Sequence, residues 1–309
     1  MDVKRSILQE IKTESLQKRG ISVYIKRDDL IDPEISGNKW RKLKYNIALC
    51  VSKKKDGILT FGGAYSNHLV ATAAACKMGS LRSIGFARGD ELNSESNSTL
   101  KRCGELGMEL VFVSREEYAM RNDKAYHETV GADYPSMQLV PEGGANYYGM
   151  IGCQEILSEI DLSFDHIFLA QGTTTTSCGI LFGTNENQQV HVVPALKGFD
   201  SISEMNTLFL KATIDKEMIA DLMKRVVVHG DAHFGGYAKY TPELIEFIRS
   251  FYREHEIQLD PIYTGKAMFE MMKQLDLPKF DNSKVLFVHT GGLQGVPGVE
   301  KKLGEKLFQ

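Results

Sequence analysis

Short apolar runs alternate with helix-like segments along most of this chain of 309 residues. The run at residues 57–61 has the composition of a buried strand, and an apolar helix is expected over residues 67–78. Comparable runs lie at residues 82–87, 108–113, 166–170, 190–195 and 284–289, and a second helix is expected near residues 96–106. Because short apolar strands separated by helices form parallel sheets covered on both faces, the sequence predicts the α/β fold class.

Four polar, glycine-rich runs follow strand-like segments. They occupy residues 62–68, 141–146, 171–179 and 290–292. In open parallel sheets, ligands bind at the carboxyl ends of the strands. Together with a lysine-bearing turn around Lys39, these runs predict one composite cofactor site.

The run after residue 170 is the best candidate for binding a phosphate group. It contains Gly172, Thr173, Thr174, Thr175 and Thr176, which offer hydroxyl and backbone N–H donors between a strand and the start of a helix. The helix dipole also favours an anion there. The alternative is a polar turn with one threonine as N-cap. The run is neither a Walker A loop nor a Gly-x-Gly-x-x-Gly dinucleotide fingerprint.

Lys39 follows the turn Ser36-Gly37-Asn38, which is expected to open a helix. A cation is poorly placed at a helix N-terminus, because that end of the dipole is positive. A neutral lysine amine can attack an aldehyde, as a lysine that forms a Schiff base with pyridoxal phosphate does. The alternative is a surface lysine on a basic helix, since Arg41, Lys42 and Lys44 follow.

Ser66 and Asn67 lie at the start of the helix expected over residues 67–78, so N-capping is a sufficient structural role for one of them. In a pyridoxal-phosphate site, the Asn67 amide would donate to the phenolic oxygen of the ring and orient it. His68 would be able to move protons, although a histidine in the first turn of a helix is by default structural or solvated.

Two further residues are candidates for contacts with a planar ring. Thr290 ends a buried strand before two glycines, and its hydroxyl would meet a pyridine nitrogen without holding it protonated. Tyr263 follows an Asp-Pro turn and would cover a ring or serve as an acid or base near the substrate. The alternatives are a polar strand terminus and a packing aromatic.

Composition excludes several classes of partner. The net charge of −3 argues against nucleic acid, and no apolar stretch has the length of a membrane span. Five scattered cysteines without a Cys-x-x-Cys spacing fit a reducing compartment with neither a disulfide framework nor a metal site. No apolar run follows the first residues, so no signal peptide is expected. The expected location is the cytoplasm.

Assembled in order, these motifs resemble the 1-aminocyclopropane-1-carboxylate deaminase/D-cysteine desulfhydrase family. Its members are pyridoxal-phosphate enzymes of the tryptophan-synthase-β-like fold (fold type II). The resemblance covers nearly the whole chain and keeps the motif order. It rests on Ile25-Lys26-Arg27-Asp28-Asp29-Leu30, Gly37-Asn38-Lys39-Trp40-Arg41-Lys42-Leu43, Gly62-Gly63 with Ser66-Asn67-His68, Pro141-Glu142-Gly143-Gly144, Leu259-Asp260-Pro261 with Tyr263 and Gly265-Lys266, and His289-Thr290-Gly291-Gly292.

The resemblance implies two parallel-sheet α/β domains, a large one from residues 1–48 and 148–309 and a small one from residues 49–147. It implies pyridoxal 5'-phosphate as cofactor, with Lys39 as the Schiff-base lysine and Asn67 at the ring oxygen. Ser66 would lie near the substrate carboxylate and Tyr263 close to the ring. A small amino acid is the expected substrate and a homodimer the expected assembly. The lysine would remove the α-proton, in lyase chemistry whose last step is a hydrolysis.

The subtype follows from two positions. Family members that are deaminases carry a glutamate after the tyrosine and a leucine before the last Gly-Gly, where this chain has Thr264 and Thr290. These residues favour α,β-elimination from D-cysteine, giving pyruvate, ammonia and sulfide. Tyr65 stands where the family has glutamine.

Three alternatives remain. The first is opening of the aminocyclopropane ring to 2-oxobutyrate and ammonia. The second is a non-catalytic protein that binds pyridoxal phosphate or an amino acid. In the third, the threonine run binds another phosphometabolite and Lys39 is structural.

Overall fold

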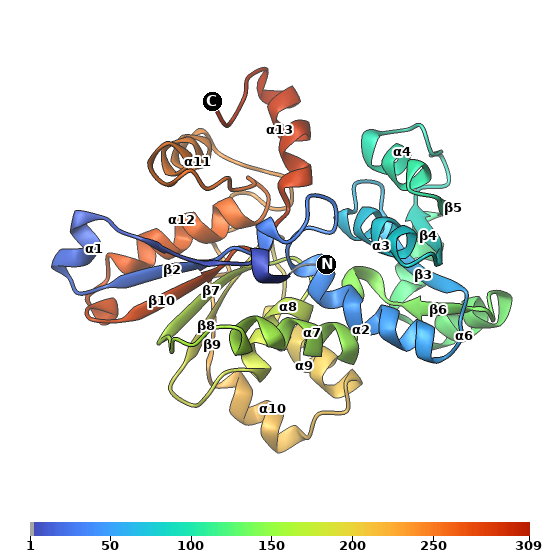
Figure 1. Cartoon of the computed structure of the whole chain (residues 1–309), viewed down its shortest axis with the longest axis horizontal. Coiled ribbons are helices and arrows are strands. Elements are labelled where there is room, and N and C mark those ends of the chain that lie inside the picture. The colour runs from blue at the N-terminus through green and yellow to red at the C-terminus, as the bar shows by residue number, and fades with distance from the viewer. Residues whose placement is uncertain (1–2) are drawn as a thin grey trace. The chain divides into compact units, whose positions relative to one another are not determined.

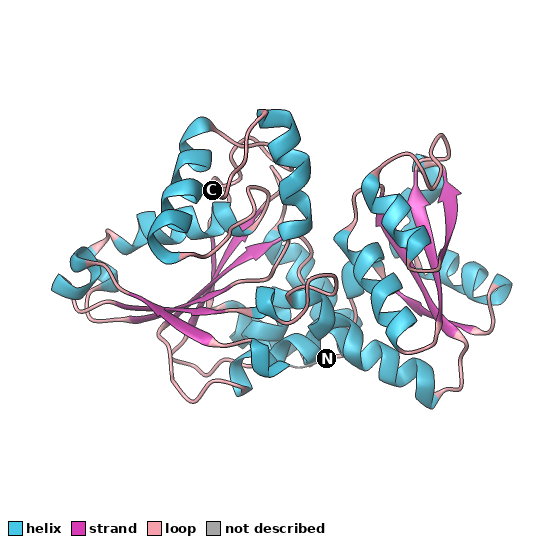
Figure 2. Ribbon diagram, turned by 45° about the horizontal axis from the view of Figure 1, so that its top comes forward, coloured by secondary structure: helices cyan, strands magenta, loops and turns pink. Residues whose placement is uncertain are grey.

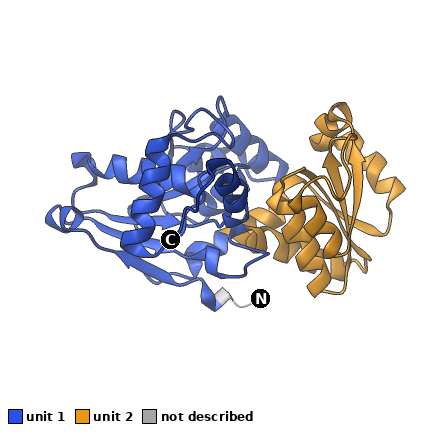
Figure 3. Ribbon diagram, turned by 90° about the horizontal axis from the view of Figure 1, so that it is seen from above, with its two compact units in different colours: residues 1–38, 154–309 blue, residues 39–153 orange. Residues whose placement is uncertain are grey.

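The computed structural model describes residues 3–309 (Figure 1). The chain forms two compact units, coloured separately in Figure 3: unit 1 comprises residues 1–38 and 154–309, and unit 2 comprises residues 39–153. The chain passes from one unit to the other at the start of helix α2 (Asn38–Ser52) and within helix α7 (Tyr147–Ser158). The predicted boundaries, after residues 48 and 147, fall inside these two helices. The division into a large cofactor-binding domain and a small domain stays a prediction.

Unit 1 is built on a six-stranded sheet with strand order β1-β2-β10-β7-β8-β9. Its strands are β1 (Leu8–Ile11), β2 (Ser22–Lys26), β7 (His166–Gln171), β8 (Gln189–Pro194), β9 (Val226–Val228) and β10 (Lys284–Val288). All neighbours pair in parallel except β1, which runs antiparallel to β2 at one edge. Helices α12 (Thr264–Leu275) and α8 (Thr175–Phe182) both pack against β7 and β8, and lie on opposite faces of the sheet (Figure 1).

Unit 2 is built on a four-stranded sheet, entirely parallel, with strand order β5-β4-β3-β6. Its strands are β3 (Gly57–Gly63), β4 (Arg82–Arg88), β5 (Met108–Val113) and β6 (Met137–Val140). Helix α3 (Asn67–Met78) packs against β3 and β4 (Figure 2). Residues 68–76 of this helix are all buried. Its many alanines have small side chains, which let the helix approach the sheet closely.

The remaining helices connect the strands. In unit 1 they are α1 (Glu14–Lys18), α9 (Ser201–Lys211), α10 (Lys216–Met223), α11 (Pro242–His255) and α13 (Val296–Leu303). In unit 2 they are α4 (Ser98–Glu105), α5 (Arg115–Ala119) and α6 (Lys124–Asp133). Within residues 3–309, no helix is both long and apolar enough to cross a membrane.

The α/β class with two parallel sheets, predicted from the sequence, is confirmed. The helix predicted over residues 67–78 has these bounds in the structure, and the strand predicted over residues 108–113 does too. The other predicted strands agree within one or two residues at their ends. The antiparallel edge strand β1 and the short β9 were not predicted, because each has only three or four residues, too few to show a strand pattern.

A series of polar side chains in contact with one another runs across unit 1 and ends on helix α12. His166 Nδ1 lies 3.1 Å from His191 Nε2, and His191 Nδ1 lies 3.0 Å from His229 Nε2. The series ends at Glu270, whose Oε1 is 3.2 Å from His229 Nδ1 and accepts from Gln274. Phe168 stacks on His191 with a centroid separation of 4.1 Å. Burial, together with the neighbouring histidines and Lys279, lowers the pKa of His191 to about 2, so His191 is neutral.

Candidate functional site

The threonine loop (Gly172–Thr176) follows β7 in unit 1 and leads directly into α8. Thr174, Thr175 and Thr176 are buried, while Gly172 and Thr173 are half-buried. Thr174 occupies the N-cap of α8 but makes no side-chain capping bond there. The first-turn N–H groups of the helix are therefore left to another acceptor. The hydroxyls and the uncapped N–H groups are donors that suit a phosphate, and the helix dipole favours its negative charge. The residues present therefore fit the phosphate of pyridoxal phosphate.

The Ser36-Gly37-Asn38 turn connects this loop with the end of β10. Asn38 Nδ2 donates to Thr176 Oγ1 at 2.8 Å, and the Asn38 backbone N–H donates to the Thr290 carbonyl at 3.2 Å. Gly37 has φ +61°, and a Cβ there would lie 2.0 Å from the Thr290 oxygen. Only glycine permits this approach of two backbones. Thr290 itself is 6% exposed.

Helix α2 begins at Asn38, so Lys39 occupies its first turn, as the sequence predicts. Lys39 is half-buried, whereas Lys42, one turn later, is 3% exposed. Lys39 directly follows Asn38, so their Cα atoms are about 3.8 Å apart. Asn38 is the residue whose side chain contacts Thr176.

Asp260 organises the start of α12. Its carboxylate accepts from the backbone N–H groups of Ile262, Tyr263 and Thr264 at 2.7–2.9 Å, and from the Thr264 hydroxyl at 2.7 Å. The Thr264 hydroxyl in turn accepts from the Asp260 N–H at 2.9 Å. Burial raises the pKa of Asp260, and the hydrogen bonds from Thr264, Tyr263 and Ile262 oppose that rise. Thr264 is fully buried, and its hydroxyl both donates to and accepts from Asp260.

Tyr263 lies between the threonine loop and a second tyrosine. A Cβ on Gly172 would lie 2.8 Å from Tyr263 Cε1, so the ring covers the start of the loop. On its other side the ring meets Tyr237 edge-on, with centroids 6.1 Å apart and an interplanar angle of 66°. Tyr237 was not predicted as a site residue, because nothing in the turn-rich segment around it distinguishes it in the sequence.

In unit 2, Ser66 is the N-cap of α3 and its hydroxyl accepts from the Leu69 N–H at 3.4 Å. This identifies Ser66 as the capping member of the Ser66-Asn67 pair, and Asn67 is the first residue of the helix. A Cβ on Gly62 would lie 2.7 Å from Ser66 Oγ, so the glycine lets the cap approach β3. Both Ser66 and Asn67 are half-buried.

His68 is buried, and its bond to Thr60 fixes the positions of its protons. Thr60 Oγ1 donates to the Val140 carbonyl at 2.8 Å, so it accepts from His68 Nε2 at 2.9 Å. The Nδ1 atom is therefore unprotonated, and it has no hydrogen-bond partner among residues 3–309. Burial, together with the charges of Lys42 and Lys39, lowers the pKa of His68 to about 3. His68 thus presents a neutral acceptor in the electrostatic field of both lysines.

The sequence singled out Lys39, Ser66, Asn67, the threonine loop, Tyr263 and Thr290. The structure brings Tyr263 and the threonine loop together within unit 1, and brings Thr290 and the threonine loop into contact with Asn38. Lys39, Ser66 and Asn67 lie in unit 2. The roles of Asn38, Asp260 and Thr60 as supports were missed, since each depends on contacts between residues far apart in sequence.

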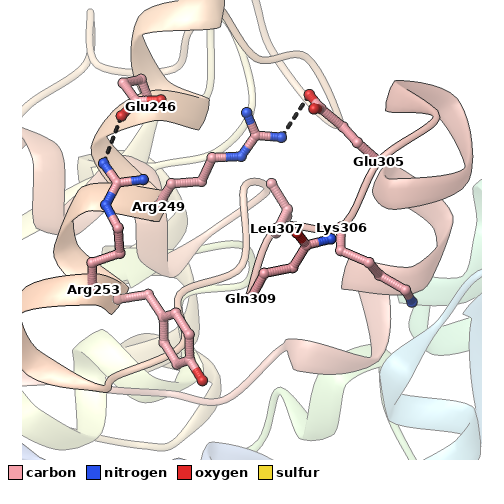
Figure 4. Close-up of a pocket in the computed structure, with 8 residues that line it drawn as sticks. Glu246, Arg249, Arg253, Glu305, Lys306, Leu307 and Gln309 are labelled. Carbon is pink, nitrogen blue, oxygen red and sulfur yellow. Dashed lines mark hydrogen bonds and ion pairs between the residues drawn. The ribbon is translucent and has the colours of Figure 1, made fainter.

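A separate depression of about 280 Å³ lies between α11 and the C-terminal segment (Figure 4). Its arginines are paired, Arg253 with Glu246 at 2.8 Å and Arg249 with Glu305 at 2.6 Å. A larger depression of about 960 Å³ contains His229 and Glu270. Neither contains any site residue predicted from the sequence.

Comparison with known proteins gives consistent matches. The sequence profile of the pyridoxal-phosphate dependent enzyme family matches residues 4–291. A bifunctional D-cysteine desulfhydrase/1-aminocyclopropane-1-carboxylate deaminase of Arabidopsis thaliana is 31% identical over 301 residues, which cover 90% of this chain and 74% of that protein. A proposed 1-aminocyclopropane-1-carboxylate deaminase of Pyrococcus horikoshii is 33% identical over 288 residues, covering 89% and 86% of the two chains.

A crystal structure of a homologue of 1-aminocyclopropane-1-carboxylate deaminase superposes with a TM-score of 0.78 at 28% identity, covering 97% of this chain and 93% of that one. These relatives support lyase and deaminase chemistry rather than the broader hydrolase class. The chain therefore belongs to the pyridoxal-phosphate dependent enzymes and, within them, to the 1-aminocyclopropane-1-carboxylate deaminase/D-cysteine desulfhydrase family, as its sequence predicts.

Proposed function

We propose that this enzyme catalyses α,β-elimination from a small amino acid, with D-cysteine as the model substrate and pyruvate, ammonia and sulfide as products. The observation that carries this proposal is the state of Thr264. Its hydroxyl is fully buried and both donates to and accepts from Asp260. A threonine at position 264 offers no carboxylate for proton transfer, unlike the glutamate that follows the tyrosine in the deaminase pattern. The Thr264 hydroxyl is already bonded to Asp260.

Each candidate residue has a proposed role. Lys39 would hold the cofactor and then, as a free amine, accept the α-proton of the substrate. A position in the first turn of α2 would disfavour its ammonium form, because that end of the helix dipole is positive. Ser66 would bind the substrate carboxylate and Asn67 would orient the ring through its phenolic oxygen.

The threonine loop and α8 would bind the cofactor phosphate, while Thr290 would face the pyridine nitrogen. Tyr263 would bound the substrate on one side and serve as an acid or base for the leaving group. When bound, pyridoxal phosphate delocalises the charge that develops at the substrate α-carbon. A hydroxyl at the pyridine nitrogen leaves that delocalisation weaker than a carboxylate would, which suits a substrate with an acidic α-proton and a good leaving group.

Ring opening of 1-aminocyclopropane-1-carboxylate is the second candidate. It is favoured by the names of the relatives, one of which is called bifunctional and another a proposed deaminase. This substrate carries no α-proton, so Lys39 would have to act elsewhere on it. We place it second because of Thr264 and Thr290.

The test is a substrate profile of the holoenzyme. D-cysteine, L-cysteine and 1-aminocyclopropane-1-carboxylate are supplied in parallel, and sulfide, pyruvate and 2-oxobutyrate are measured. We expect sulfide and pyruvate in equal amounts from D-cysteine and at most a trace of 2-oxobutyrate. Robust 2-oxobutyrate formation would replace the first candidate by the second. Borohydride reduction followed by peptide mapping locates the attachment residue, and a label on any lysine other than Lys39 would refute its assignment.

A homodimer and a cytoplasmic location stay predictions of the family resemblance and of the composition. Light scattering on the purified holoenzyme measures the first. Cell fractionation measures the second.

A further inference from the structure

Lys266 is an internal cation that the proposed reaction does not use. It lies in the first turn of α12 and is only 1% exposed. Its ammonium donates to two backbone carbonyls, those of His233 and Gly236, both at 2.8 Å. Burial lowers its pKa to about 8, and Asp260 partly offsets this. A buried lysine is stable only where its hydrogen bonds compensate for lost hydration, and the two carbonyls supply these bonds to Lys266.

Both carbonyls belong to one strained segment, the 229–241 loop between β9 and α11. Phe234, Gly235, Gly236 and Ala238 all have positive φ, at 52°, 92°, 115° and 53°. Two of the four are not glycine, and such residues adopt this conformation only where surrounding contacts impose it. Internal bonds, such as the one from the Gly235 N–H to His233 Nδ1 at 2.9 Å, supply part of that constraint. Lys266 supplies a constraint from outside the loop.

The loop carries Tyr237, placed directly after the second carbonyl that Lys266 binds. Tyr237 is 47% exposed, and its ring stands edge-on to Tyr263. Tyr263 in turn covers Gly172 of the threonine loop. An unbroken series of contacts within unit 1 therefore leads from Lys266 through the loop to Tyr237, Tyr263 and the threonine loop.

We propose that Lys266 is a positioning residue for the reaction, because it fixes the 229–241 loop so that Tyr237 stands against Tyr263. This proposal rests on the proposed function of Tyr263 as a residue at the substrate. Lys266 acts through Tyr237, and it contacts neither the threonine loop nor α8 in the hydrogen bonds it makes. Its loss should therefore affect turnover far more than cofactor binding.

The matched variants are Lys266→Met and Lys273→Met. Both remove a lysine from α12, but Lys273 is exposed on the same helix. In Lys266→Met we expect faster hydrogen exchange at residues 233–239, cofactor affinity within about twofold of wild type, and a fall in kcat/KM of about 10- to 100-fold, the scale of a misplaced active-site group. Lys273→Met should change none of the three. Should Lys266→Met fail to fold, Lys266→Gln, which retains an N–H donor, takes its place.

A double-mutant cycle with Tyr237→Ala separates positioning from general stabilisation. If Lys266 acts through Tyr237, then Lys266→Met should lower kcat/KM by less than about twofold in the Tyr237→Ala background. Additive losses, unchanged hydrogen exchange in the loop, or a loss of cofactor affinity as large as the loss of turnover would each overturn the proposal. Absence of turnover in the wild type would instead refute the proposed function, and the hydrogen-exchange comparison would still decide whether Lys266 holds the loop.

Discussion

The candidate residues of the two units differ in how far their polar groups are satisfied within the protein. In unit 1, the Asp260 carboxylate receives four donors, and the Thr264 hydroxyl both donates and accepts. In unit 2, His68 keeps a buried nitrogen for which the described part of the chain supplies no partner. We propose that unit 1 supplies a frame of mutually satisfied polar groups for the cofactor, whereas His68 in unit 2 retains hydrogen-bonding capacity for a ligand.

The largest expected effect concerns Lys39, the proposed reactive residue of unit 2. Lys39→Ala should lower turnover by about 10²–10⁴-fold, since it removes both the attachment point and the base. The free energy of unfolding should change little, because Lys39 is half-buried in the first turn of α2. Steady-state kinetics and urea unfolding measure the two quantities. Lys53→Ala, an exposed lysine just after α2, is the control. Full activity in Lys39→Ala would remove this residue from the mechanism.

The next largest effect concerns Asp260, which organises the frame in unit 1. Asp260→Asn leaves backbone N–H groups and a hydroxyl facing an amide instead of a carboxylate, so we expect a loss of about 3 kcal/mol in the free energy of unfolding. Urea unfolding of the apoenzyme measures it without reference to activity. Asp276→Asn, an exposed residue at the C-terminal end of the same helix, should cost nearly nothing. Equal stability of the two variants would mean that Asp260 is not the organiser of this helix start.

The contrast between the two units also explains what the sequence could predict. Strand order along the chain, the helix over residues 67–78 and the placement of glycine runs at strand ends follow from periodicity and turn chemistry, which are local. The family motifs also identified the cofactor, and the match to a family of pyridoxal-phosphate dependent enzymes disfavours both the hypothesis of a non-catalytic binding protein and that of another phosphometabolite. The role of Asp260 was hidden because an Asp-Pro pair before a helix usually marks only a turn.

Contacts between distant residues set the remaining features. Asn38 meets Thr176 across 138 positions, and Thr60 fixes His68 through a carbonyl of β6. No local sequence pattern predicts such pairs. Thr264 shows the consequence most clearly: the sequence marked it as a difference from deaminases, and only the structure shows that Asp260 occupies its hydroxyl.

A pH titration compares His191 and His68, two buried histidines whose pKa values are lowered. Burial lowers the pKa of His191 in unit 1 to about 2 and that of His68 in unit 2 to about 3. Below about pH 6.5, the unfolded chain binds more protons than the folded one. The free energy of unfolding is therefore highest above that pH, and each histidine should lower it by about 1.4 kcal/mol per pH unit as the pH falls toward the folded pKa values. His191→Gln and His68→Gln should each reduce the slope.

Lys39→Ala separates these two histidines further. Because Lys39 and Lys42 contribute to the low pKa of His68 but not to that of His191, the variant should raise the pKa of His68 alone. Imidazole NMR resonances follow both groups in one sample. A parallel change at His191, or none at His68, would contradict the proximity of Lys39 to His68.

The smallest expected effect on stability lies in the threonine loop. Thr176→Val removes the acceptor of the Asn38 amide, and one unsatisfied buried donor should cost about 1 kcal/mol of folding free energy. Thr173→Val should cost much less, because Thr173 is half-buried and its hydroxyl lies 3.5 Å from that of Thr175. If both hydroxyls also donate to the cofactor phosphate, each variant should weaken cofactor binding by about 1.5–3 kcal/mol, measured by equilibrium titration. Unchanged affinity in both variants would assign phosphate binding to the backbone N–H groups of α8 alone, and the frame in unit 1 would then act through its main chain.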